Sequence, residues 1–155
     1  MSYELRMERL FDAPPEVVFD TYLDPAWQKE IWDNMVPGWR LLEFDIDLRV
    51  GGTWTIVFGE PGAKPDRVTS VFTTIERPHR LVVEEATYAS RVDATVHTTV
   101  DLTFEEVEGK TLLRILQTGF ASEAARDGLE RGWPSFLDAL ERVIRSKGGG
   151  SEGSK

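Results

Sequence analysis

Alternating hydrophobic and polar positions run through most of the chain and predict seven β-strands. Apolar side chains at every second position lie on one face of a strand. In residues 95–104, for example, Val100 and Phe104 share one face while His97 and Asp101 share the other. The predicted strands are residues 3–11, 41–48, 53–58, 67–75, 81–87, 95–104 and 111–118. Most are joined by short turns, so we expect an antiparallel sheet.

Helical spacing of apolar residues predicts two short helices directly after the first strand. We expect Asp12 to cap the first helix, with Pro14-Pro15 in its first turn. Asp24-Pro25 interrupts the pattern, and a second short helix then carries Trp27, Ile31 and Trp32.

A third, long helix is predicted after Ser122, which we expect to cap it. Its apolar residues form one wide stripe, and Gly132 and Pro134 are expected to kink or restart it. The stripe consists of Leu129, Trp133, Phe136, Leu137, Leu140 and Ile144. A helix with a single apolar face must lay it on another element, so the pattern predicts an α+β domain with the helix covering the sheet.

Composition limits the classes of function. The 155 residues carry a formal net charge of −9, which disfavours binding to nucleic acid and to anionic membranes. The sequence contains no cysteine and no apolar run long enough to span a bilayer, so we expect a cytoplasmic protein without membrane insertion. Residues 1–147 are expected to form one domain, and residues 148–155 a flexible Gly/Ser tail like that of an added linker.

Four motifs resemble one known family. They are Phe11–Phe19, Asp47–Trp54, Ile75–Leu81 and Gln117–Phe120 with Gly132-Trp133 beyond it. The sequence is similar to the homologues of the activator of heat-shock-protein-90 ATPase, of the single-domain bacterial kind, in the START-like (SRPBCC) superfamily. The resemblance implies the helix-grip fold, in which a curved seven-stranded antiparallel sheet wraps around a long C-terminal helix. These motifs are mostly turns and core aromatics, so they are specific for the fold rather than for a function.

The expected site is an apolar pocket between the long helix and the sheet, because concave spaces lined by aromatic residues are typical ligand sites. We interpret the protein as a binder of a small hydrophobic molecule, with no catalytic residue, cofactor or metal assigned. The pocket candidates are Trp32, Trp39, Trp54, Ile56, Phe58, Phe72, Val83, Glu85, Gln117, Trp133, Phe136, Leu137 and Leu140.

Two of these candidates have competing interpretations. Glu85 either faces the pocket, where burial would raise its pKa, or lies at a solvated strand end, which is the commoner place for glutamate. The amide of Gln117 either reaches the pocket or hydrogen-bonds the loop around Gly119, and we favour the loop.

Two other functions stay open. The first is an enzyme like the polyketide cyclases and aromatases of the superfamily, for which Glu85, Tyr88 and Asp93 are the candidate titratable groups. The second is a regulator of a chaperone ATPase or a stress-response interaction module. We place this role third, because the eukaryotic activators have an additional N-terminal domain that this sequence does not show.

The histidines and two outward leucines bear on a metal site and on a dimer. His79 and His97 are the only histidines and lack further ligands nearby in the sequence, so we expect no bound metal. Leu112 and Leu116 fall on the face of their strand opposite to Leu113 and Ile115, which indicates a homodimer or simply two exposed leucines.

Overall fold

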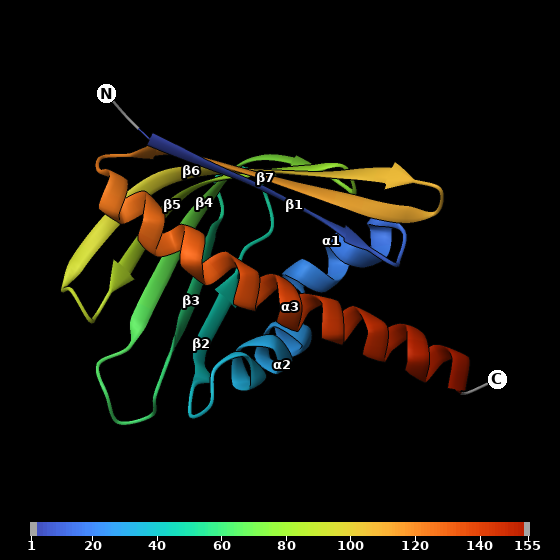
Figure 1. The fold of residues 1–155 in the computed structure, drawn as a ribbon, viewed down its shortest axis with the longest axis horizontal. Helices are drawn as coiled ribbons and strands as arrows, with labels where there is room; N and C mark the ends of the chain where they lie inside the picture. The colour runs from blue at the N-terminus through green and yellow to red at the C-terminus, as the bar shows by residue number, and fades with distance from the viewer. Residues whose placement is uncertain (1–2, 154–155) are drawn as a thin grey trace.

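The computed structural model describes the backbone of residues 3–153 and the side chains of residues 3–147. The chain order is one strand, two short helices, six strands and one long helix (Figure 1). The elements are β1 (Tyr3–Phe11), α1 (Pro15–Leu23), α2 (Pro25–Met35), β2 (Arg40–Ile46), β3 (Thr53–Gly59), β4 (Asp66–Glu76), β5 (Arg80–Ala89), β6 (Ala94–Val107), β7 (Lys110–Phe120) and α3 (Glu123–Gly153).

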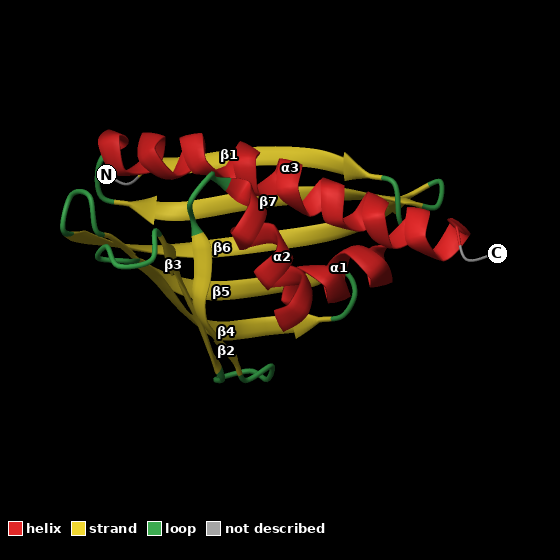
Figure 2. Ribbon diagram, turned by 90° about the horizontal axis from the view of Figure 1, so that it is seen from below, coloured by secondary structure: helices red, strands yellow, loops and turns green. Residues whose placement is uncertain are grey.

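The seven strands form one sheet in the order β1-β7-β6-β5-β4-β3-β2, and every neighbouring pair is antiparallel. The sheet is curved, and α1, α2 and α3 all lie on one side of it (Figure 2). The predicted α+β class and the helix-grip arrangement are therefore confirmed. We call the face toward the helices the inner face.

The Gly51-Gly52 turn between β2 and β3 depends on glycine. A Cβ atom on Gly52 would collide with the backbone carbonyl of Asp47, and Gly51 has a φ of +85°, which disfavours other residues. The predicted strand 41–48 is too long, because β2 ends at Ile46 and Leu48 lies in this loop, 48% exposed.

Helix capping differs in part from the expectation. Asp12 does not cap α1, whose first turn follows Pro14 with no side-chain cap. Asp24 instead caps α2 by accepting hydrogen bonds from the backbone N–H groups of Ala26 and Trp27. Ser122 caps α3 as predicted, since its hydroxyl accepts from the Ala125 N–H.

Helix α3 is continuous through Pro134, which excludes the predicted restart near Trp133, while the alternative of a kink stays a prediction. The helix also includes residues 148–153, the first part of the predicted tail, whereas residues 154–155 lie outside the described residues. Arg9 of β1 holds the solvent side of α3 by donating to Asp138 at 2.8 Å and Glu141 at 3.0 Å.

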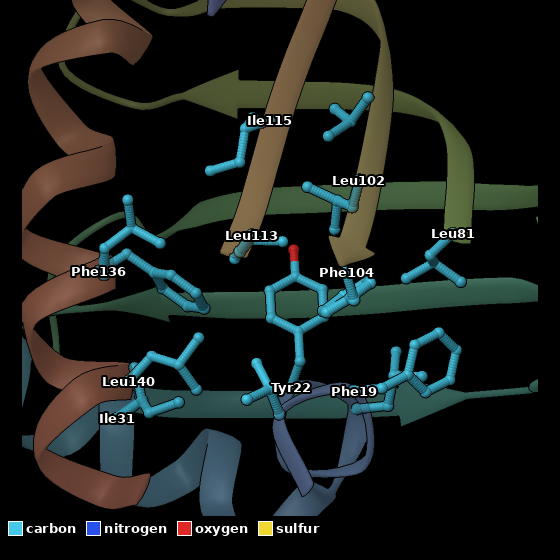
Figure 3. Close-up of a cluster of buried hydrophobic side chains, with 14 of the residues drawn as sticks. Phe19, Tyr22, Ile31, Leu81, Leu102, Phe104, Leu113, Ile115, Phe136 and Leu140 are labelled. Carbon is cyan, nitrogen blue, oxygen red and sulfur yellow. The ribbon is translucent and has the colours of Figure 1, made fainter. Parts of the chain in front are cut away.

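The core lies between the inner face and the helices. The largest side chains with almost no exposed surface include Phe11, Phe19, Phe104, Phe120 and Leu140. Figure 3 shows part of this cluster, with Tyr22 rising from α1 between Phe136 of α3 and the strands. The apolar stripe of α3 therefore packs where its spacing predicted.

Truncating Leu113 tests the inner face of β7. Leu113 is 1% exposed, so Leu113→Ala should lower the free energy of unfolding by about 2–5 kcal/mol, as large-to-small core changes do. Leu112→Ala, its neighbour on the outer face, is the matched control and should cost less than about 1 kcal/mol. Urea unfolding followed by circular dichroism measures both, and equal losses would contradict the assignment of faces.

Candidate functional site

A row of four side chains crosses the inner face at directly paired positions. Trp54 of β3 pairs with Ser70 of β4, Ser70 pairs with Glu85 of β5, and Glu85 pairs with Thr98 of β6. Paired side chains on one face have Cβ atoms about 5 Å apart. We call these four residues the central row. Ser70 has the smallest side chain of the row, and it separates a large indole from a carboxylate.

Glu85 faces inward, which decides between its two interpretations. Its Oε1 accepts hydrogen bonds from the Thr87 hydroxyl at 3.2 Å and from the Gln117 amide at 3.4 Å. Both donors are neutral, and no ion pair among the described side chains includes Glu85. Burial raises the pKa of Glu85 to about 7, and the hydrogen bond from Thr87 opposes that rise.

Gln117 connects the sheet to α3. Its amide nitrogen donates to Thr98 Oγ1 at 2.9 Å as well as to Glu85, and its carbonyl oxygen accepts from the indole N–H of Trp133 at 3.0 Å. The expectation that this amide bonds the loop around Gly119 is therefore wrong. The side chain is 1% exposed and spans from β6 and β5 to the first half of the long helix.

Aromatic rings fill much of the space beside the central row. Trp32 stacks on Phe58 with centroids 4.0 Å apart, and Trp54 stacks on Phe72 at 5.7 Å. Tyr22 makes edge contacts that join these stacks to α3, at 5.6 Å to Trp54 and 5.8 Å to Phe136. We call the set the aromatic cluster: Tyr22, Trp32, Trp39, Phe44, Trp54, Phe58, Phe72, Trp133 and Phe136.

Several inward side chains of this region keep a little exposed surface. Six inward residues retain 5–8% exposure, whereas Phe11, Phe19, Phe104 and Phe120 retain at most 1%. The six are Tyr22, Trp32, Trp54, Ile56, Phe58 and Phe136. Part of each of these six side chains is therefore accessible to solvent.

Three polar groups here are left without full hydrogen bonding. The indole nitrogen of Trp54 is buried with no partner among the described residues. The Tyr22 hydroxyl and the second carboxylate oxygen of Glu85 also have no protein partner there, but they keep contact with solvent. Burial, together with the charge of Glu85, raises the pKa of Tyr22, which places the phenol within electrostatic reach of that carboxylate.

The structure brings most of the predicted pocket residues together. Ile56, Phe58, Phe72 and Val83 lie on the inner face, while Leu137 and Leu140 lie deeper under α3 than the cluster, at 2% and 0% exposure. The sequence reasoning missed Tyr22, Ser70, Thr87 and Thr98. The alternation of β6 carried a signal for Thr98, which stands between inward Val96 and Val100.

Tyr88 and Asp93 do not join the site, so this part of the prediction is wrong. The Tyr88 hydroxyl donates to Asp93 at 2.6 Å near the β5–β6 hairpin, with Lys64 beside both. Tyr88 lies on the outer face because it is an odd number of residues from Glu85.

Two open hollows lie on the described surface. One of about 430 Å³ crosses the outer face over β4–β7, beside Val71, Glu84 and His97, and its lining also includes Glu85 and Thr98 of the central row. The other adjoins His79, Thr103 and Arg114.

Within the described part of the chain, no three His, Cys, Asp or Glu side chains are grouped as metal ligands, and no helix is long and apolar enough to cross a membrane. Leu112 and Leu116 are half-buried on the outer face, so the homodimer stays a prediction.

A curved sheet that wraps a long helix, with a polar row at the back of an aromatic space, defines a START-like helix-grip domain of the pocket type. Residues 12–145 match the family model described as Activator of Hsp90 ATPase homolog 1-like protein. The chain therefore belongs to this family.

Solved structures agree on the fold. An AHSA1-like protein from Aeromonas hydrophila is 22% identical, with a TM-score of 0.75 and 94% of each chain covered. A protein from Rhodobacter sphaeroides is 24% identical, with a TM-score of 0.76 and coverage of 92% of this chain and 93% of that one. A protein from Rhizobium leguminosarum is 18% identical, with a TM-score of 0.77 and coverage of 94% and 96%. A comparison with curated proteins finds no match.

Replacing Glu85 tests its burial through the pH dependence of stability. The unfolded chain releases this proton near pH 4.5 and the folded chain near pH 7, so the free energy of unfolding should fall as pH rises between them. Glu85→Gln removes that fall, and its stability relative to the parent should grow by about 1–3 kcal/mol from pH 4.5 to pH 8. Urea unfolding at several pH values measures the difference.

The matched control is Glu84→Gln, which removes the same charge from the outer face of the same strand. It separates the effect of burial from that of net charge. Parallel pH profiles for Glu85→Gln and the parent would show that the carboxyl is not buried in the folded protein.

Proposed function

We propose that this domain binds a small hydrophobic molecule between α3 and the inner face of the sheet. The aromatic cluster surrounds the apolar part of the ligand, and the central row meets its polar end. One observation carries the proposal: Glu85 faces an aromatic space with only neutral protein partners, beside a Tyr22 hydroxyl that has none among the described residues. The buried indole N–H of Trp54 has no partner among the described residues, which costs about 1–3 kcal/mol, and a ligand that accepts from it recovers that energy.

The surroundings suit an apolar guest. Ligand sites are mostly apolar, with a few polar groups that fix orientation. Here the rings of Trp32, Phe58 and Phe136 supply apolar surface, and their residual exposure supports an entry for small molecules. Membership of the family supports a pocket-type protein in general. That the ligand is a small hydrophobic molecule is our proposal.

The first half of α3 forms the wall that can adapt to a ligand. Pro134 has no N–H, so the helix lacks the hydrogen bond to the carbonyl of Glu130 at that turn. Trp133 and Phe136 lie on either side of this weak point, and Trp133 is tied to the sheet by Gln117. A small displacement of this turn enlarges the space without disturbing the deeper contacts of Leu137 and Leu140.

Native mass spectrometry of freshly purified protein tests the proposal. We expect an adduct of small-molecule mass that disappears under denaturing conditions, with the released compound identified in an organic extract. Ser70→Leu narrows the space in the central row and should remove most of the adduct. Val71→Leu, the next residue on the outer face, is the matched control and should keep it.

Two results together would overturn the proposal. The first is a bare polypeptide mass, and the second is no binding of a neutral apolar dye such as N-phenyl-1-naphthylamine to the folded protein. That result would favour the interaction role, which the family description supports by its reference to a chaperone ATPase.

The second candidate function is an enzyme, and the raised pKa of Glu85 favours it. A carboxyl with a pKa of about 7 is matched to proton transfer near neutral pH. The polyketide cyclase-like alternative would have Glu85 move a proton on the bound molecule, with Tyr22 as a hydrogen-bond donor. Turnover of the extracted compound by the parent but not by Glu85→Gln would support this candidate over simple binding.

A further inference from the structure

The charges around the pocket are one-sided. Glu85 is the only carboxylate of the central row, and its donors, Thr87 and Gln117, are neutral. Each element packed around it presents an uncharged group: Tyr22 from α1, Ser70 from β4, Thr98 from β6 and Trp133 from α3. Of these, only Tyr22 is titratable, and burial raises its pKa, so it stays neutral.

The arginines nearest to the helix-sheet interface are used elsewhere. Arg9 is bound to Asp138 and Glu141, and Arg126 to Glu123 and Asp127. The described ion pairs therefore supply no positive charge to Glu85. A carboxylate in an apolar site is stable in its charged form only when a cation or several donors compensate it.

The aromatic cluster offers a second attraction to a cation. The faces of Trp and Tyr rings attract cations within about 6 Å of the ring centre. Trp54 is separated from Glu85 by Ser70 alone, and the Tyr22 ring lies 5.6 Å from that of Trp54. A cationic head above Ser70 would thus meet a carboxylate oxygen without a protein partner on one side and aromatic rings on the other.

We propose that the ligand is a hydrophobic amine, whose protonated nitrogen sits over Ser70 between Glu85 and the Trp54 and Tyr22 rings. This inference rests on the proposed function and adds the chemical class of the ligand. The apolar body of the amine lies toward the rings of Trp32, Phe58 and Phe136. Glu85 is the only charged group of the central row. A carboxylate-bearing ligand would be repelled from the same position.

A panel with one skeleton and three head groups tests the inference by isothermal titration calorimetry. The probes are 4-phenylbutylamine, 4-phenylbutanol and 4-phenylbutanoate. At pH 8 the amine should bind at least tenfold more tightly than the alcohol, and the acid should bind most weakly. An alkylamine stays protonated up to about pH 10, so only the protein titrates between pH 5 and pH 8.

The pH dependence adds a signature of the carboxylate. The affinity for the amine should fall about tenfold per pH unit below pH 7, as Glu85 takes up its proton, while that for the alcohol changes little. Glu85→Gln should reduce the affinity for the amine to that for the alcohol, and circular dichroism should show that the variant is folded. Glu84→Gln, on the outer face, should keep the preference for the amine.

The outcomes separate the two proposals. Alcohol binding equal to or tighter than amine binding would overturn the amine inference and leave the hydrophobic pocket standing. Retention of the amine preference in Glu85→Gln would overturn the role of that carboxylate. Failure of all three probes, with no adduct in native mass spectrometry, would overturn both the inference and the proposed function.

Discussion

The pairing register of the antiparallel sheet determines which side chains meet the helices. From β3 to β6, direct pairs place Trp54, Ser70, Glu85 and Thr98 in one line across the inner face. Because successive residues of a strand point to opposite faces, a slip of one residue would turn this line outward and bring Val71 and Glu84 inward. The apolar neighbours Phe72 and Val83, in the next inward row, make such a slip costly, so the core fixes the position of the polar groups.

The long helix is held to the sheet by two different interactions, with aromatic contacts between them. Near one end, Gln117 binds the indole of Trp133 on the inner side. Farther along, Arg9 binds Asp138 and Glu141 from the edge strand. Between the two, contact with the sheet is made by the rings of Phe136 and its neighbours, which a side-chain rearrangement can separate without unfolding either attachment.

The sequence predicted the fold well because most of its strands alternate between apolar and polar residues. Strands such as β3 and β6 have a polar and an apolar face, so the inward positions of Trp54, Ile56 and Phe58 followed directly. In β5, Val82 and Val83 are both apolar and both buried, so alternation did not reveal the direction of Glu85. Tyr88, three residues farther along β5, points to the other face, where its partner Asp93 lies with it at the exposed hairpin.

Contacts between segments distant in the sequence could not be predicted from the pattern of apolar and polar residues. Helical spacing placed Tyr22 on the apolar face of its helix. It did not show that the Tyr22 hydroxyl would lie within electrostatic reach of a carboxylate on β5. The loop role expected for Gln117 assumed a local partner, as short side-chain bonds often provide. Its actual partners come from three elements that meet only in the folded protein.

The energetic position of Glu85 connects stability to binding. An inward carboxyl with only neutral donors at 3.2 and 3.4 Å is not needed to hold the fold, because an apolar residue of similar size would fill the row without a desolvation cost. Near neutral pH the folded state must either protonate this group or leave its charge poorly compensated. A cationic ligand removes that cost on binding, so the feature that weakens the empty domain is the same one that would favour the occupied domain.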